Sequence, residues 1–203
     1  MANSNKIMMP FGKLTSDPSS PDGDGIVLGT GLLACAAVLQ AIVAAFVHSD
    51  VIKLHPSTVT EKSLKEFPAR IEYAFHYQTL LALWLLFNVM TTMFKRAASG
   101  AMNPMDETTE VRVKSIKAVL TNSLESIVLS VLLQLIFVSF AAPGCVLKCI
   151  PLINIIQFFG RITHYAGYPM YRGFGFSLTL MPNLLMAGYN LYKFGAFLQL
   201  YRG

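Results

Sequence analysis

The chain has 203 residues, of which 54% are hydrophobic and 13% are charged, whereas soluble domains carry about 25% charged residues. This composition excludes an ordinary water-soluble fold, and the long apolar runs predict several membrane spans within one domain. The net charge of +5 comes from lysines and arginines at the ends of these runs and not from a basic, aromatic surface. We therefore expect no nucleic-acid partner.

The N-terminal part of the chain divides into a tail, a first span and a connector. Residues 1–25 are rich in Ser, Pro, Asp and Gly without an apolar face, which predicts a disordered tail. Residues 26–47 have the length and apolarity of a membrane-spanning helix. Small residues recur there at four-residue intervals, which indicates either close packing on another helix or ordinary membrane composition. A polar connector is expected over 48–72.

Four further apolar runs predict four more spans. A tight turn at Pro143-Gly144 between the second and third of these runs requires the two helices to be antiparallel. The fold class predicted from the runs is an all-α integral membrane protein with five spans. The four later spans are expected at 73–94, 117–140, 146–168 and 174–200.

The distribution of basic residues predicts an orientation. Five spans place the two termini on opposite sides of the membrane, and eight lysines and arginines then lie on the N-terminal side against six on the other. Because cytoplasmic loops carry an excess of basic residues, this bias favours a cytoplasmic N-terminus and a cytoplasmic loop between the second and third spans.

Polar residues inside the third and fourth spans converge on one membrane face. Asn122 and Glu125 are three residues apart and share a helical face, and a carboxylate in an apolar run must face protein or water. In the next span Arg161, His164 and Tyr168 also share a face. Since the two helices are antiparallel, we expect the five side chains to lie at a similar depth.

The cluster has two interpretations. Glu125 and Arg161 are the preferred ion pair, because each offsets the cost of burying the other. A structural cluster that fixes helix register is one reading, and an anion-binding site that also includes Arg172 is the other. The number of ionisable groups favours the site. The sequence contains no motif for a catalytic metal, a nucleophile elbow, a phosphate loop or a dinucleotide fold.

Two stretches of the chain read TEVRVKSIKAVLTNSLESI and FFGRITHYAGYPMYRGFGFSLTLMPNLLM. They resemble the MAPEG superfamily of membrane-associated proteins in eicosanoid and glutathione metabolism, and the likeness covers about residues 80–192. The resemblance implies a MAPEG-like four-helix membrane domain over 73–200, with the span at 26–47 as an addition. It also implies a homotrimer in the endoplasmic reticulum or another endomembrane, with glutathione bound between subunits at the cytoplasmic side.

The resemblance also assigns roles to individual residues. Arg161 would support the pocket through Glu125, and Arg172 would be the catalytic residue that stabilises the glutathione thiolate for attack on an electrophile. A fixed cation favours the thiolate, which is the nucleophile, over a thiol with a pKa of about 8.5. The residues expected to hold glutathione are Asn122, Glu125, Arg161, His164 and Tyr168.

Several positions depart from the glutathione-using enzymes of the superfamily. Ala118, Leu120 and Thr121 stand where those enzymes usually carry arginines and a histidine, and Gly173 and Phe176 replace a serine and a tyrosine. With the additional first span, the chain looks more like the mattrin-like five-span branch. We therefore expect a non-catalytic trafficking or regulatory protein. The alternative is a membrane-bound glutathione transferase or peroxidase acting on lipophilic electrophiles.

Overall fold

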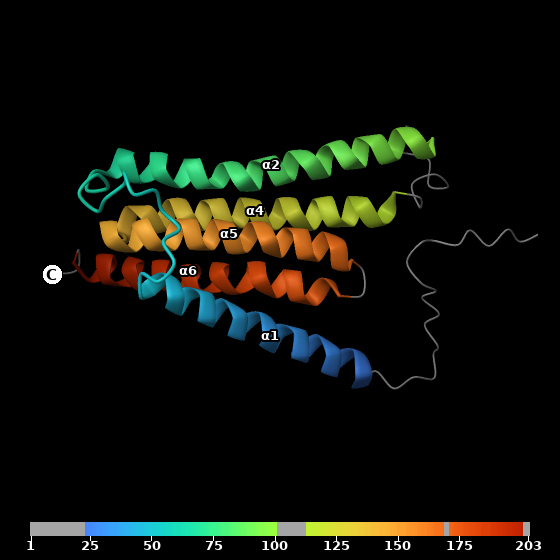
Figure 1. Ribbon diagram of the computed structural model, residues 1–203, viewed down its shortest axis with the longest axis horizontal. Coiled ribbons are helices and arrows are strands. Elements are labelled where there is room, and N and C mark those ends of the chain that lie inside the picture. The colour runs from blue at the N-terminus through green and yellow to red at the C-terminus, as the bar shows by residue number, and fades with distance from the viewer. Residues whose placement is uncertain (1–22, 101–112, 169–170, 201–203) are drawn as a thin grey trace, which may run out of the picture.

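The computed structural model describes residues 23–100, 113–168 and 171–200, and over these residues the protein is entirely helical. Helices α2, α4, α5 and α6 lie side by side, and α1 crosses the outside of α6 (Figure 1). The predicted all-α class is confirmed for the described residues. The helices are α1 (Gly23–His48), α2 (Phe67–Ser99), α4 (Lys114–Phe140), α5 (Pro143–Gly167) and α6 (Arg172–Leu200).

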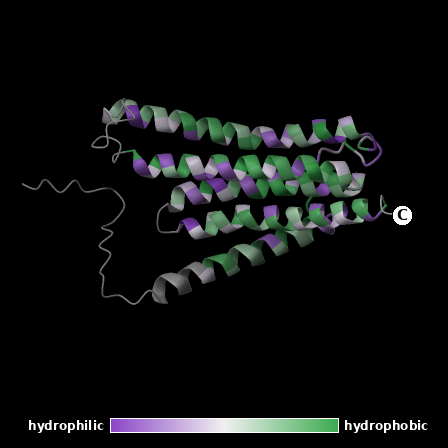
Figure 2. Cartoon of the chain, turned by 180° about the vertical axis from the view of Figure 1, so that it is seen from behind, coloured by the Kyte–Doolittle hydropathy of each residue, from purple (hydrophilic) through white to green (hydrophobic). Residues whose placement is uncertain are grey.

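Four of the described helices are long and apolar enough to cross a membrane, namely Thr30–His48 of α1 and the whole of α2, α4 and α5. Their outer faces expose large apolar side chains, such as Leu83 and Leu132, and Figure 2 shows these helices as mainly hydrophobic. This surface fits a lipid bilayer and identifies an integral membrane protein.

The fifth predicted span, at 174–200, does not meet the same criterion. Helix α6 has 29 residues and lies along α5, but it is not among the four helices that are apolar enough to span. The reason is its content of polar residues, which includes Asn183, Asn190 and Lys193.

The helices extend beyond the predicted apolar runs. Helix α1 already begins at Gly23, and residues 1–22 of the predicted tail lie outside the described part of the chain. Helix α2 begins at Phe67 because Pro68 suits the first turn of a helix, and it ends where Gly100 adopts a φ of 71°. Hydropathy finds the apolar centre of a helix but not the polar turns at its ends.

The link between α4 and α5 corrects one detail of the prediction. Only Ala141 and Ala142 join the two helices, and Pro143 is the first residue of α5, not part of a turn. Ala142 is extended, with a φ of −67° and a ψ of 149°, which is the conformation that a following proline favours. The two helices are antiparallel, as predicted (Figure 1).

Residues 49–66 cover one end of the bundle, which we call the connector end. Leu64 is buried there in the core cluster that includes Val138 and Ile150. The Arg70 guanidinium donates hydrogen bonds from Nε to the Leu64 carbonyl at 2.7 Å and from Nη1 to the Ala141 carbonyl at 2.9 Å. These bonds satisfy carbonyls in the connector and at the end of α4, and they fix the connector on the bundle.

A set of buried amide side chains, which we call the amide ladder, runs through the centre of the bundle. Asn154 Nδ2 donates to Gln134 Oε1 at 2.8 Å, and Gln78 Nε2 donates to the same oxygen at 3.2 Å. Gln157 Nε2 donates to Asn183 Oδ1 at 2.7 Å. The ladder joins α2, α4, α5 and α6 through the polar interhelical bonds that stabilise helix pairs in membranes.

Helix α1 packs on α6. Ala36 is completely buried, and Gln40 Nε2 donates to the Ser177 carbonyl at 3.3 Å. Ala41 and Ala45, which belong to the four-residue repeat, are exposed. These two residues of the repeat therefore do not form the contact with α6.

Candidate functional site

The end of the bundle opposite the connector, which we call the groove end, depends on a close contact between α5 and α6. A Cβ atom at Gly175 would lie 2.7 Å from the His164 Cα, and one at Gly160 would lie 2.7 Å from Thr179 Cγ2. Both distances are far below normal contact, so glycine is required for the two backbones to approach. The contact brings the last turn of α5 against the first turn of α6, which begins at Arg172.

A groove of about 660 Å³ opens between α4, the end of α5 and the start of α6. Its volume falls in the range of small-molecule sites. Five of the six residues proposed for the site from the sequence line it, and the sixth, Arg161, is not among the lining residues. The groove is lined by Lys114, Lys117, Ala118, Thr121, Asn122, Glu125, His164, Tyr168, Arg172, Gly173 and Phe176.

Arg161 is buried beside the groove and has a relative exposure of 1%. Its Nη1 donates to Asn122 Oδ1 at 2.8 Å, and its Nη2 donates to Ser126 Oγ at 2.8 Å and to Thr179 Oγ1. The guanidinium thus connects three helices and fixes the Asn122 side chain that lines the groove. All of these acceptors are neutral.

The predicted ion pair between Arg161 and Glu125 is wrong. The structure shows no ion pair between them, and Arg161 bonds to Asn122 and Ser126 instead. Asn122 and Ser126 are four residues apart and share the face of α4 that meets α5, whereas Glu125 is on the flank of that face. The expected coupling of Arg161 to the pocket passes through Asn122, not through Glu125.

Glu125 is exposed on α4 and makes no ion pair with another described residue. Its neighbours Leu124, Val128 and Leu129 are also exposed, with relative exposures of 45–48%. A carboxylate on an otherwise apolar helix face is costly to place in lipid. Glu125 also lines the groove, so a polar ligand there would lower this cost.

His164, Tyr168 and Arg172 form a cluster at the groove end. The His164 Nδ1 lies 3.3 Å from the Arg172 carbonyl oxygen, and the centres of the His164 and Tyr168 rings are 6.2 Å apart. The Arg172 guanidinium lies over the Tyr168 ring at 5.8 Å, a cation–π distance. The ring therefore holds the cation beside the groove.

The charges of the groove suit a ligand that carries both signs. Lys114, Lys117 and Arg172 are exposed cations along its lining, and Glu125 is the acidic residue of that lining. Lysine and arginine bind carboxylates, and a carboxylate binds an ammonium group. The arrangement can therefore hold a small peptide with free carboxyl groups and a free amine.

Sequence reasoning did not find the two hydroxyl partners of Arg161, Ser126 and Thr179. Ser126 could have been found, because it is one turn from Asn122 on the same helical face. Thr179 gives no such signal, because its place depends on the close contact of α5 with α6. Gly173 and Phe176, two positions singled out from the sequence, do line the groove.

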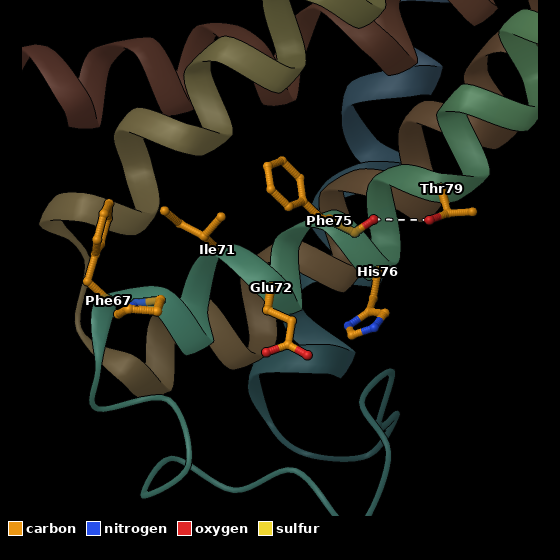
Figure 3. Close-up of a pocket in the computed structure, with 7 residues that line it drawn as sticks. Phe67, Ile71, Glu72, Phe75, His76 and Thr79 are labelled. Atoms are coloured by element: carbon orange, nitrogen blue, oxygen red, sulfur yellow. Dashed lines mark hydrogen bonds between the residues drawn. The ribbon is translucent and has the colours of Figure 1, made fainter.

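A second hollow, of about 540 Å³, lies on the outer face of α2 near its start (Figure 3). In Figure 3 Glu72 and His76 extend on the same side of α2, whereas Phe75 points away from them. The residues lining this hollow belong to one helix, so no second element fixes a ligand. It is lined by Phe67, Pro68, Ile71, Glu72, Phe75, His76 and Thr79.

Comparisons with known proteins find no matching protein-family model, no matching curated protein and no matching solved structure.

Proposed function

We propose that this integral membrane protein binds a glutathione-type peptide in the groove and acts as a non-catalytic trafficking or regulatory protein of the MAPEG type. One observation carries the proposal. Asn122, Glu125, His164, Tyr168 and Arg172 come from three helices, and all five line the same groove. Glutathione has two carboxylates, one ammonium group and one thiol, and the groove offers cations and an acid to the charged groups.

The charged groups of the ligand have specific partners in this proposal. Arg172 and Lys117 bind the carboxylates, and the planar guanidinium can do so through two parallel hydrogen bonds. Glu125 binds the ammonium group, which gives this exposed carboxylate a partner. Asn122, held by Arg161 at 2.8 Å, bonds to the peptide backbone of the ligand.

The proposed absence of catalysis rests on the lack of hydroxyl groups at two positions that follow Arg172 in the groove lining. Gly173 and Phe176 are the α6 residues of the lining that follow Arg172, and neither carries a hydroxyl group. Donors at these positions would help to stabilise charge that develops on a reacting ligand. The proposal places the N-terminus and the groove end on the cytoplasmic side of the endoplasmic reticulum or another endomembrane.

The proposed assembly is a homotrimer. The face of α4 that exposes Glu125 also exposes the large apolar side chains Leu124 and Val128. A second copy would remove Glu125 from lipid and complete the open side of the groove. Native mass spectrometry of the protein released from detergent would measure the number of copies, and a monomer would contradict this part of the proposal.

The second candidate is a glutathione transferase or peroxidase acting on lipophilic electrophiles. Its support is Arg172, whose guanidinium is held over Tyr168 beside the groove. Phe176 is 40% exposed and would give an electrophile dissolved in the bilayer an apolar approach. Turnover of a lipophilic electrophile by the purified protein, lost in Arg172→Ala, would favour this candidate over the non-catalytic one.

Thermal unfolding in detergent with and without millimolar glutathione tests the proposed binding. We expect glutathione to stabilise the protein, and Arg172→Ala and Glu125→Gln each to weaken binding about tenfold or more, since a hydrogen bond to a charged group contributes about 1.5–3 kcal/mol. Lys65→Ala and Glu66→Gln change exposed residues near the connector end and are the matched controls. No stabilisation of the wild-type protein would contradict the proposal.

A further inference from the structure

The charges of the groove are ordered along its length. Arg161 bonds to Ser126 of α4 and to Thr179 of α6, so these two residues lie at a similar depth in the bundle. Arg172 begins α6 and precedes Thr179 by two turns, which places it about 10 Å nearer the groove end, since a helix rises about 1.5 Å per residue. Glu125 is next to Ser126 and is the lining residue of α4 that lies furthest from that end.

The cations of the lining lie at its outer end. Lys114 and Lys117 belong to the first turn of α4, which begins at the same end of the bundle as α6 (Figure 1). With 27 residues, α4 is about 40 Å long, which matches a bilayer with its headgroup regions. Its first turn therefore lies at headgroup depth, and Arg172 lies just inside it. From outside inward, the lining presents cations, then Thr121, then the Glu125 carboxylate.

An apolar surface continues from the groove along α6. Phe176 lines the groove between the depths of Arg172 and Glu125 and is 40% exposed. Leu184, about two turns further along α6, is 55% exposed. This surface leaves the face of α4 free for a second copy in the proposed trimer. A ligand that fits both the groove and this surface has a charged end and an apolar chain.

The order of the charges distinguishes among lipids. In phosphatidylcholine and similar phospholipids, the ammonium group lies outside the phosphate, so it would meet the cations of the groove. In a sphingoid base phosphate, the phosphate is terminal, an ammonium group and a hydroxyl group follow, and a single chain comes last. That order matches the lining, because lysine and arginine bind phosphate and a carboxylate binds an ammonium group.

We infer that the groove binds a single-chain lipid of the sphingoid base phosphate class. The three cations of the lining contact its phosphate, which like other phosphomonoesters carries a charge of about −1.5 to −2 at pH 7. Glu125 contacts the ammonium group, and the chain passes Phe176 into the bilayer. The inference goes beyond the proposed peptide binding and does not depend on it, because no group of the peptide takes part.

A general attraction of the cations to anionic lipid is the competing explanation. Basic residues at a membrane surface attract any anionic headgroup. In that case Glu125 makes no contact with the lipid, and replacing it changes the binding of all anionic lipids in the same way. The position of the ammonium group within the lipid is therefore the property to vary.

Native mass spectrometry of the full-length protein, released from detergent, measures the bound lipid. Three single-chain probes of matched chain length are compared: sphingosine-1-phosphate, lysophosphatidic acid, which lacks the ammonium group, and lysophosphatidylcholine, whose ammonium group lies outside the phosphate. We expect sphingosine-1-phosphate to bind about fivefold more tightly than lysophosphatidic acid, the upper range for one exposed ion pair. Lysophosphatidylcholine should bind most weakly.

Glu125→Gln is the test variant. It should weaken the binding of sphingosine-1-phosphate about fivefold, while lysophosphatidic acid binds as before or more tightly, because the carboxylate attracts the ammonium group and repels the phosphate. Misfolding would instead weaken both. Lys114→Gln should weaken the binding of both lipids, and Glu72→Gln and Lys62→Gln, at exposed residues outside the groove, should behave as wild type.

Two results would overturn the inference. One is equal binding of sphingosine-1-phosphate and lysophosphatidylcholine by the wild-type protein. The other is an unchanged ratio of the affinities for sphingosine-1-phosphate and lysophosphatidic acid in Glu125→Gln. Neither result bears on the proposed peptide binding, which the stabilisation by glutathione tests separately.

Discussion

The two ends of the bundle differ in what their polar side chains contact. At the connector end, Arg70 bonds to backbone carbonyls of Leu64, Lys65 and Ala141. At the groove end, the buried Arg161 bonds to side chains of Asn122, Ser126 and Thr179. Polar residues at the connector end therefore stabilise the fold, whereas those at the groove end lie in or beside the lining of a groove. Variants that affect one end and not the other test this separation.

The largest effect is expected from Gly175→Ala. The added methyl group would overlap the backbone of His164, and backbone atoms cannot move away as a flexible side chain can. We expect a loss of about 3 kcal/mol or more in the free energy of unfolding, because overpacking costs about 1–3 kcal/mol even among side chains. Thermal unfolding in detergent would measure it, and glutathione binding should be lost because α5 and α6 no longer meet.

Gly188→Ala is the matched control on the same helix. No atom lies within 4 Å of a Cβ built at Gly188. Alanine is favoured over glycine within a helix by about 1 kcal/mol, so this variant should be as stable as wild type or more stable. Equal destabilisation by the two variants would show that the close contact at Gly175 is not special.

A smaller effect is expected from Arg70→Met at the connector end. Methionine keeps an apolar stem but removes the donors that reach Leu64, Lys65 and Ala141. We expect a loss of about 2 kcal/mol in the free energy of unfolding, since part of the guanidinium is accessible to water and a bond to a charged group contributes about 1.5–3 kcal/mol when buried. Lys62→Met, an exposed neighbour in the connector, should have no effect.

Arg70→Met also tests whether the connector end influences binding in the groove. If Arg70 serves only the fold, Arg70→Met should leave the dissociation constant for glutathione unchanged at a temperature where the protein is folded. A tenfold weaker binding in Arg70→Met would mean that the connector end influences the groove, and the separation of the two ends would fail.

The amide ladder lies between the two ends, and Gln134→Leu tests it. The substitution removes the oxygen to which Gln78 and Asn154 donate and the donor to Ser130, which lies 3.0 Å away. Polar bonds between membrane helices contribute about 0.6 kcal/mol each on average, so we expect a total loss of about 1–2 kcal/mol. Gln199→Leu changes an exposed glutamine near the end of α6 and should be neutral. A fully stable Gln134→Leu protein would mean that apolar packing alone holds the bundle.

Sequence periodicity predicted the helices and most of the groove because both depend on local spacing. Asn122 and Glu125, and likewise His164 and Tyr168, are within one or two turns of each other on a single helix. The antiparallel link of α4 to α5 then brings the two pairs together. Hydropathy was less informative for α6, whose asparagines and lysine lower its mean hydropathy even though it packs along α5.

The failed ion pair shows where sequence reasoning reached its limit. Glu125 was the predicted partner of Arg161 because it carries the opposite charge and was expected at a similar depth in the membrane. The rotation of α4 about its own axis is set by packing, however, and residue spacing in the sequence does not define it. That rotation presents Asn122 and Ser126 to α5 and leaves Glu125 outside. The amide ladder was missed for a related reason, because each of its bonds joins residues from two different helices.

The smallest effect is expected from Asp50→Asn at the connector end. The hydrogen bond from Lys148, at 2.8 Å, holds the pKa of Asp50 below its usual value of 3.8. A lowered pKa means that the ionised form stabilises the folded state at neutral pH and that this stabilisation is lost as the pH falls through the pKa of the folded protein. Asparagine tolerates the φ of 59° at this position, so the variant changes mainly the charge.

Asp50 is exposed and Lys148 is partly exposed, so the difference between wild type and Asp50→Asn should be small at neutral pH and should shrink in high salt. It should vanish at acidic pH, once the pH falls below the lowered pKa of Asp50. Thermal unfolding in detergent from acidic to neutral pH would measure it. In a double-mutant cycle, Lys148→Met should remove the effect of Asp50→Asn. The stability difference caused by an ion pair must disappear both at low pH and in the Lys148→Met background. A difference that persists under both conditions would show that Asp50 acts through the backbone of the connector and not through its charge.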